Sequence, residues 1–395
     1  MSRANQTLRL NAFLMPTGHH VAGWRHPAAQ ADGGSSIEHY LALARTAERG
    51  GFDALFLSDT LAMLPGSADA LSRMARTEHF EPLTLLAALA ASTQRIGLIA
   101  TVTTSYNKVT DVAASFSSLQ AISGGRCGWN LVTSSNAQEA FNFGRDQHYA
   151  HAERYRQAES FHAQVCERLA GLGERPVQVL AGDSEAGRAL AARHAEVLFT
   201  AQPTLEGARH FYRDVKGRLA QHGRHADSLK IMPGILPIIG RCRAEAEDRH
   251  DLLQSLVQSQ VGLSLLSDVA GGTDLSCYPL DGPLPELPLT ESGRSRQQLL
   301  VEVARAENLS IRQLYLRIAN ARGHLAVVGT AVDIADTLEA WFQQYAADGF
   351  NVMPPWLPGG LDDFVERVIP ELQRRGLFRT CYSGRTLREH LGLAA

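Results

Sequence analysis

A histidine-rich segment near the start of the chain is the first candidate for chemistry. Residues 16–27 read PTGHHVAGWRHP, with three histidines, one tryptophan and one arginine. Imidazole exchanges a proton near neutral pH, so His20 and its neighbours could form a substrate and proton-handling loop. The alternative is a surface loop anchored by a buried Trp24. We predict no metal site, because no carboxylate or thiolate set completes the ligands.

A second candidate is the turn Ala181-Gly-Asp-Ser184, which runs directly into an expected helix. Free backbone N–H groups and the helix dipole make such a helix start an anion site. The turn is typical of the phosphate cradle found late in many barrels. Ordinary capping of the helix by Asp183 or Ser184 explains the same residues equally well.

Further polar residues follow three other expected strands. Asp59 follows the second, Thr103 ends the third, and Asn130 lies in the fourth. Their side chains suit hydrogen bonds to a polar ring or a phosphate ester, although capping of the next helices is the simpler interpretation. His151 and Tyr155 are four residues apart and would share one face of a helix.

The elements that must position these residues alternate between apolar strands and amphipathic helices, which indicates a parallel sheet buried on both faces. Eight such units favour a closed (β/α)8 TIM barrel, which places functional residues at the carboxyl ends of its strands. We expect one domain over residues 1–395, interrupted by insertion segments at about 136–173 and 262–328. The expected strands are Leu8–Met15, Ala54–Ser58, Ile96–Thr103, Cys127–Thr133, Val177–Ala181, Val197–Ala201, Leu229–Ile239 and Phe350–Met353.

Composition narrows the class of protein. The 395 residues carry a net charge of −3 without a run of Lys or Arg, which argues against nucleic acid or membrane as a partner. Five scattered cysteines without a CxxC pair predict reduced thiols in a cytoplasmic protein. No signal peptide is expected. The Rossmann glycine fingerprint, the Walker loop, the G-x-S-x-G elbow and H-E-x-x-H are all missing.

Taken together, the segments resemble one family over nearly the whole chain. It is the branch of the luciferase-like flavin monooxygenases that includes nitrilotriacetate, EDTA and dibenzothiophene-sulfone monooxygenases. The matching pieces are Phe13–His20 with Trp24-Arg25, Glu81–Ala88, Arg95–Thr101, Ser123–Arg126, Gly128–Asn130, Asn142–Gly144, Gly323-His324, Val328–Thr330, Asp348–Phe350, Met353–Pro355 and Pro370–Thr380.

The resemblance implies an FMNH2-dependent two-component monooxygenase with a separate NAD(P)H:flavin reductase as partner. O2 would be captured as a flavin C4a-(hydro)peroxide that oxidises a small organic N-, S- or C-centred substrate. It also implies a homodimer or homotetramer. By position, Asp59, Thr103 and Asn130 would face the isoalloxazine or ribityl chain. The phosphate would lie among His151, Tyr155, Gly182, Asp183 and Ser184, and the substrate among Phe13, His20, Trp24, Phe56 and His324. His20 or His324 would deliver or remove the proton, with a structural hydrogen bond as the alternative for each.

Two departures from the family pattern leave alternatives open. Relatives carry several tens of additional residues before Val177, in a segment that the resemblance places beside the active-site mouth. Its absence here is expected to open the pocket, change the substrate or weaken FMN retention. Asp183 stands where relatives have a small or hydroxyl residue, and its carboxylate would repel a phosphate unless it points away. A flavin or deazaflavin oxidoreductase and a degenerate flavin-binding protein are the alternatives.

Overall fold

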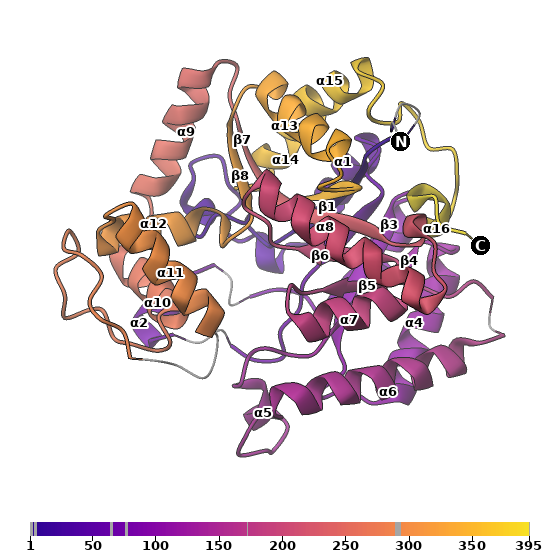
Figure 1. Cartoon of the computed structure of the whole chain (residues 1–395). Coiled ribbons are helices and arrows are strands. Elements are labelled where there is room, and N and C mark those ends of the chain that lie inside the picture. Colours follow the sequence, from indigo (N-terminus) through magenta and orange to yellow (C-terminus); the bar gives the residue numbers. More distant parts are fainter. Residues whose placement is uncertain are drawn as a thin grey trace.

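A closed ring of eight parallel strands lies at the centre of the computed structural model, which describes residues 3, 6–63, 66–75, 78–171, 173–288 and 294–394 (Figure 1). The ring order is β1-β2-β3-β4-β5-β6-β7-β9, and β9 pairs back with β1. The expected TIM barrel is therefore confirmed. The strands are β1 (Arg9–Leu14), β2 (Ala54–Leu57), β3 (Gly97–Thr103), β4 (Cys127–Val132), β5 (Val177–Ala181), β6 (Val197–Thr200), β7 (Lys230–Ile239) and β9 (Gly349–Val352).

Both faces of the ring are buried, which explains why the strands are apolar almost throughout. Side chains alternate along each strand. Phe13 and Phe56 point into the barrel interior, where they pack with Phe199. Leu10 and Leu55 point outward into a larger core beneath the helices.

The helices that cover the barrel follow the strands in turn. Neighbouring helices α4, α6, α7 and α8 contact one another in sequence. None of the helices in the described ranges is long and apolar enough to cross a membrane. The barrel helices are α1 (Ile37–Arg49), α3 (Pro82–Ser92), α4 (Val109–Ser123), α6 (His151–Leu169), α7 (Glu185–His194), α8 (Leu205–Leu219), α9 (Arg243–Ser255), α13 (Ala331–Gln343), α14 (Gly359–Asp363) and α15 (Ile369–Arg374), and α16 (Leu387–Leu391) ends the chain.

The segment expected at 262–328 forms most of a separate helical lobe. Helices α10 (Ser259–Val269), α11 (Arg294–Ala306) and α12 (Ile311–Ala321) gather with α2 (Ala68–Leu71) at one side of the barrel (Figure 1). The segment ends in a strand that the sequence pattern did not predict, β8 (Leu325–Gly329), which pairs with the second half of β7. Its sequence, LAVVG, is as apolar as those of the ring strands, but only one of its residues is buried.

The segment expected at 136–173 is mostly regular structure. It begins with the short helix α5 (Glu139–Asn142) and continues into α6, which is the barrel helix that follows β4. Helix α6 packs against α4 and α7. The irregular part is therefore the stretch around α5.

Candidate active site

A cavity of about 360 Å³ lies at the carboxyl ends of β1 and β2. Its wall includes Phe13, Asp59, His79, Arg322 and His324. Sequence reasoning did not single out His79, which follows β2 at a distance in a loop without a local motif.

An aromatic cluster forms the floor beneath this cavity. The ring of Phe13 stacks on Phe56 with centroids 4.7 Å apart, and both meet the edge of Phe199. Phe199 in turn stacks on His324 at 5.2 Å. The structure thus brings Phe13, Phe56 and His324 into one aromatic cluster, and it adds Phe199 from β6.

The histidine-rich loop 16–27 places His19, rather than His20, next to the cavity wall. His19 Nε2 lies 2.9 Å from the Phe13 carbonyl, so it carries the ring proton and donates it there. His19 Nδ1 then accepts from Arg322 at 3.1 Å. His20 is only 1% exposed, and its Nδ1 accepts from the backbone of Ala22.

Close backbone contact holds this loop in place. A Cβ on Gly18 would lie 2.5 Å from the Pro355 carbonyl oxygen, and the φ of Gly18 is +113°, so only glycine fits. Trp24 lies in the 3-10 helix η1 (Gly23–Arg25) and does not line the cavity. Of the two loop residues predicted on the substrate side, His20 and Trp24, neither lines the cavity.

Arg322 brings an uncompensated positive charge to the cavity wall. It follows α12 in a left-handed conformation, with φ at +50°. In the part of the chain that the structure describes, no carboxylate lies within ion-pair distance of it. Its surface opens to the cavity while protein surrounds it on the other sides, and this partial loss of water lowers its pKa to about 10.

His324 is held neutral by its surroundings. Burial, reinforced by nearby Arg322, lowers its pKa to about 4. One ring nitrogen donates to the Thr200 carbonyl. The other, Nδ1, is buried beside Gly234 and has no hydrogen-bond partner in the described structure. His324 therefore contributes a neutral, stacked wall, and neither nitrogen is placed to give a proton to the cavity.

Asp59 forms an ion pair with His79 in the cavity wall. Asp59 Oδ1 lies 3.6 Å from His79 Nε2. The hydrogen bond to Asp59 raises the pKa of His79 above its ordinary value, against the opposing effect of burial. His79 is therefore a titratable group in the cavity wall whose pKa its carboxylate partner raises.

The turn predicted to hold a phosphate forms a capped helix start at the end of β5. Ser184 is the N-cap of α7, because its Oγ accepts from Gly187 N at 3.1 Å. Tyr155 OH lies 3.1 Å from the same Oγ, and the ring of His151 lies 4.9 Å from that of Tyr155. The first N–H groups of α7 have no partner within the helix and point out of its end.

Asp183 does not cap α7, contrary to one of the expectations for it. Its carboxylate instead accepts a hydrogen bond from the Thr200 hydroxyl on β6. The carboxylate is thus turned toward the neighbouring strand, which leaves the backbone at this turn to face a ligand.

Thr103 belongs to a chain of hydroxyl groups with a fixed direction. Its Oγ1 lies 2.7 Å from Ser134 Oγ, and Ser134 donates to Glu139, which is 4% exposed. A carboxylate only accepts, so the single Ser134 proton goes to Glu139 and the Thr103 proton goes to Ser134. Thr103 therefore offers a lone pair, and not a proton, to any ligand.

Nearby buried acceptors are left without partners. Asn130 Nδ2 donates to Thr101 at 2.9 Å, while Asn130 Oδ1 has no partner in the described ranges. Ser105 Oγ likewise has no hydrogen-bond partner in the described ranges. An unsatisfied buried polar group costs roughly 1–3 kcal/mol, so the carboxyl ends of β3 and β4 suit a ligand that brings N–H donors.

Comparison with known proteins now decides the family. The model of the luciferase-like monooxygenase family matches residues 15–170 and 157–348. The chain belongs to the luciferase-like monooxygenase family. It is a flavin-dependent monooxygenase, as the names of its curated relatives support. Of these, nitrilotriacetate monooxygenase component A from Aminobacter aminovorans is 44% identical over 99% of this chain and 97% of its own.

Two solved structures of luciferase-like relatives share the fold. EDTA monooxygenase from Chelativorans sp. BNC1 has a TM-score of 0.79 at 29% identity and covers 98% of this chain and 99% of its own. A riboflavin lyase with modified FMN has a TM-score of 0.83 at 26% identity, with 98% and 96% covered. The family implies a flavin cofactor, and the helix-start cradle and the unsatisfied Asn130 Oδ1 fit one.

The structure places the shortened connection at the end of the barrel away from the cavity, and not beside the active-site mouth as expected. The match to the nitrilotriacetate enzyme extends over 441 residues, more than this chain contains. Residues 170–176 join the end of α6 to the start of β5, at the amino ends of the strands. The connection therefore lies opposite the cavity, and its shortness cannot widen the cavity mouth directly.

Proposed function

We propose that this protein is the oxygenase component of a two-component system that uses FMNH2 and O2 to oxidise a small organic N-, S- or C-centred substrate. An NAD(P)H:flavin reductase supplies the reduced flavin. The observation that carries the proposal is the pairing of a phosphate cradle at the end of β5 with an aromatic cavity at the ends of β1 and β2.

The cofactor-binding residues divide into two groups by their chemistry. The N–H groups at the start of α7, with Ser184 and Tyr155, hold the phosphate, and His151 lies beside them. The backbone of Gly182 and Asp183 completes the turn. Asn130, Thr103 and Asp59 present acceptors to the N–H edge of the flavin. Reduced FMN, when bound, supplies the electrons for oxygen activation.

The protein's own part in the reaction is to bind, orient and exclude water. Phe13, Phe56 and Phe199 give the cavity an apolar floor, which limits water at the reacting atoms. His324 stays neutral and forms part of the wall. The His79–Asp59 pair is the proton-handling group of the cavity, because Asp59 brings the pKa of His79 upward.

The cavity favours a substrate with an apolar part and one anionic group. Arg322 has no carboxylate partner in the described structure, and a guanidinium binds carboxylate or sulfonate oxygens through paired hydrogen bonds. Nitrilotriacetate and EDTA, named in two relatives, both carry carboxylates. The aromatic floor supplies the contact for the rest of the molecule.

The test is to mix the protein with anaerobically reduced FMN, add O2 and follow flavin absorbance by stopped-flow. We expect flavin reoxidation to be slower than that of free FMNH2, and hydrogen peroxide release to fall when a substrate is present. The Ser184→Ala variant should bind FMN more weakly and approach the rate of free flavin. Reoxidation at the free rate with the wild-type protein would refute the proposal.

A further inference from the structure

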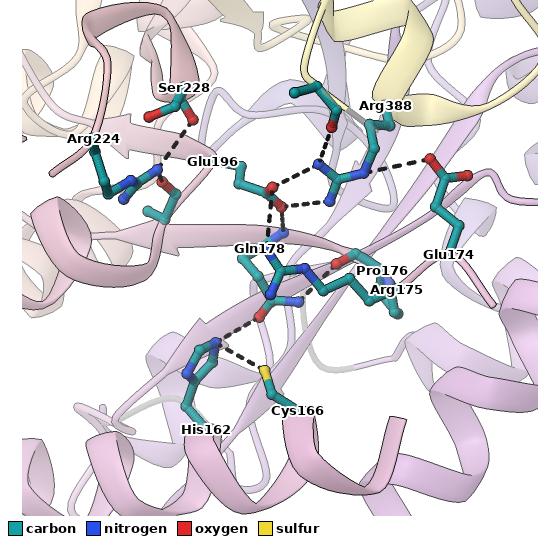
Figure 2. A network of polar contacts seen from close by, with 12 residues as sticks. His162, Cys166, Glu174, Arg175, Pro176, Gln178, Glu196, Arg224, Ser228 and Arg388 are labelled. Carbon is teal, nitrogen blue, oxygen red and sulfur yellow. Dashed lines mark hydrogen bonds and ion pairs between the residues drawn. The ribbon is translucent and has the colours of Figure 1, made fainter. Parts of the chain in front are cut away.

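A second cavity lies at the opposite end of the barrel from the candidate active site. Its volume is about 620 Å³, and it opens between the end of α6, the starts of β5 and β6, and the C-terminal residues (Figure 2). Gln178 and Glu196, in its wall, stand at the amino ends of β5 and β6. The active-site turn at Ser184 follows the carboxyl end of β5. Nothing in the proposed oxygenase reaction uses this cavity.

One side of the cavity is a closed ion cluster. Arg388 of α16 binds both carboxylate oxygens of Glu196, at 2.7 and 3.0 Å, and lies 3.4 Å from Glu174 (Figure 2). The backbone N–H of Gln178 donates to Glu196 as well, at 3.0 Å. The single positive charge of Arg388 is shared by two carboxylates, so the three side chains together carry a net charge of −1, which Arg175 near Glu196 offsets. Their role is to fasten the C-terminal helix to the barrel.

The remaining charges around the cavity are positive and incompletely paired. Arg224 donates to the backbone carbonyls of Ala191, Ala192, Ala195 and Ser228. In the described ranges it has no carboxylate within ion-pair distance. Arg175 lies 3.8 Å from Glu196, makes no hydrogen bond there, and leaves 56% of its side chain exposed. Arg193 pairs with Glu159 through one terminal nitrogen, which leaves its other donors available.

Two neutral imidazoles, those of His162 and His194, lie in the cavity wall beside these arginines. Gln178 Nε2 donates to the Pro176 carbonyl at 2.7 Å, so Gln178 Oε1 faces His162 and accepts its Nε2 proton at 3.0 Å. His162 Nδ1 therefore carries a lone pair and no proton, and it has no hydrogen-bond partner in the described structure. The residue is only 6% exposed. The ring of His194 lies 4.6 Å away, and its Nε2 makes no hydrogen bond in the described structure but lies 3.9 Å from Glu159.

Burial is the main cause of the pKa shifts of these two imidazoles, and neighbouring cations add to it. Burial, His194 and Arg175 lower the pKa of His162 to about 4. Burial also lowers the pKa of His194, and Arg193 and Arg224 add to that effect against Glu159. A bound anion would oppose these effects and let the imidazoles take up protons, which turns His162 Nδ1 into a donor.

We propose that this cavity binds a small multivalent oxyanion through Arg175, Arg193 and the His162–His194 pair. Its size lies within the roughly 300–1,000 Å³ of small-molecule sites. Guanidinium groups match carboxylate and phosphate oxygens in geometry and charge. Residues 173–175 form one rim of the cavity.

The test is isothermal titration of the full-length protein with inorganic pyrophosphate and with citrate at low ionic strength. Saturating FMN is present throughout, so that the cradle at α7 does not contribute. The Arg175→Gln/Arg193→Gln double variant changes only exposed side chains. Its matched control is Arg241→Gln/Arg243→Gln, on α9 and the turn before it, where both arginines are also exposed and ion-paired.

We expect one binding event in the wild type and in the control, weakened at least tenfold in the double variant. Affinity should rise between pH 8 and pH 5.5, with proton uptake on binding, and the His162→Gln variant should lose most of that pH dependence. No binding at millimolar anion, or equal binding by the double variant and the control, would overturn the proposal. Because the readout is anion binding, failure here would leave the oxygenase proposal unaffected.

Discussion

Replacing Arg322 with methionine separates a ligand-binding role from a structural one. The substitution keeps most of the side-chain volume and removes the charge at the cavity wall. Arg322 makes one hydrogen bond, to His19, and no ion pair in the described structure. Nothing else in the fold depends on its charge, so the variant should fold normally.

The expected change in stability is small. A pKa lowered from 12.5 to about 10 would correspond to roughly 3 kcal/mol of lost solvation if the group were fully enclosed. Because the side chain faces an open cavity, about half of that is realistic. Losing the hydrogen bond to His19 costs about 1 kcal/mol. The two effects nearly cancel, and urea unfolding should show a change within about 1 kcal/mol.

The expected change in binding is large by comparison. A hydrogen bond to a charged group contributes roughly 1.5–3 kcal/mol, which corresponds to roughly 10- to 150-fold in affinity. Binding of nitrilotriacetate and of benzoate should weaken by that factor in Arg322→Met and less in Arg322→Lys. The uncharged dibenzothiophene sulfone should bind both variants as it binds the wild type.

Two results would refute this reasoning. A loss of more than about 3 kcal/mol on unfolding would mean that Arg322 neutralises a partner in the fold. The proposal of an anionic substrate would be refuted if nitrilotriacetate and benzoate bound equally well to the wild type and to Arg322→Met, or did not bind to the wild type. The Arg25→Met variant is the control, since Arg25 belongs to the loop over this region but does not line the cavity.

Three further predictions concern the cofactor side and the titratable pair. In the Glu139→Gln variant the amide can donate to Ser134, which frees Thr103 to donate its proton to the ligand. The ratio of the affinities for oxidised and reduced FMN, measured by fluorescence and by anaerobic titration, should then shift about fivefold toward the oxidised form. An unchanged ratio would contradict the hydrogen-bond direction assigned to Thr103. Ser184→Ala should lower FMN affinity by roughly fivefold and stability by about 1 kcal/mol, because the Ser184 oxygen both caps α7 and binds the ligand. A loss of stability without a loss of FMN affinity would show that Ser184 only caps the helix. Because folding raises the pKa of His79, protonated His79 stabilises the fold. This stability is fully present below the ordinary pKa of 6.5 and is lost as the pH rises through the raised pKa. Urea unfolding between pH 6 and 8 should show this loss of stability in the wild type and not in Asp59→Asn.

The sequence by itself determined the barrel and the helix start at Ser184. The eight ring strands were predictable because a parallel sheet buried on both faces requires apolar residues on both, and that pattern is local. Gly182, Asp183 and Ser184 were predictable as a helix start for the same reason, since capping depends on residues a few positions apart. Strand β8 was not predicted although Leu325–Val328 is an apolar run, because it lies at the end of the segment expected as an insertion and pairs only with β7, outside the ring.

Only the tertiary structure decided which side chains meet and which way they point. His19 and Arg322 are 303 residues apart, and their contact depends on how the loop after β1 packs against the end of α12. Asp183 looked equally fit to cap α7 or to face a phosphate, and its hydrogen bond from Thr200 on the neighbouring strand settled its direction. The shortened connection could be recognised from the sequence, but its place at the amino ends of the strands required the fold. Local pattern fixes the elements, because backbone preference and burial act over a few residues, whereas charge pairing and hydrogen-bond direction depend on neighbours that the chain brings together only when it closes the barrel.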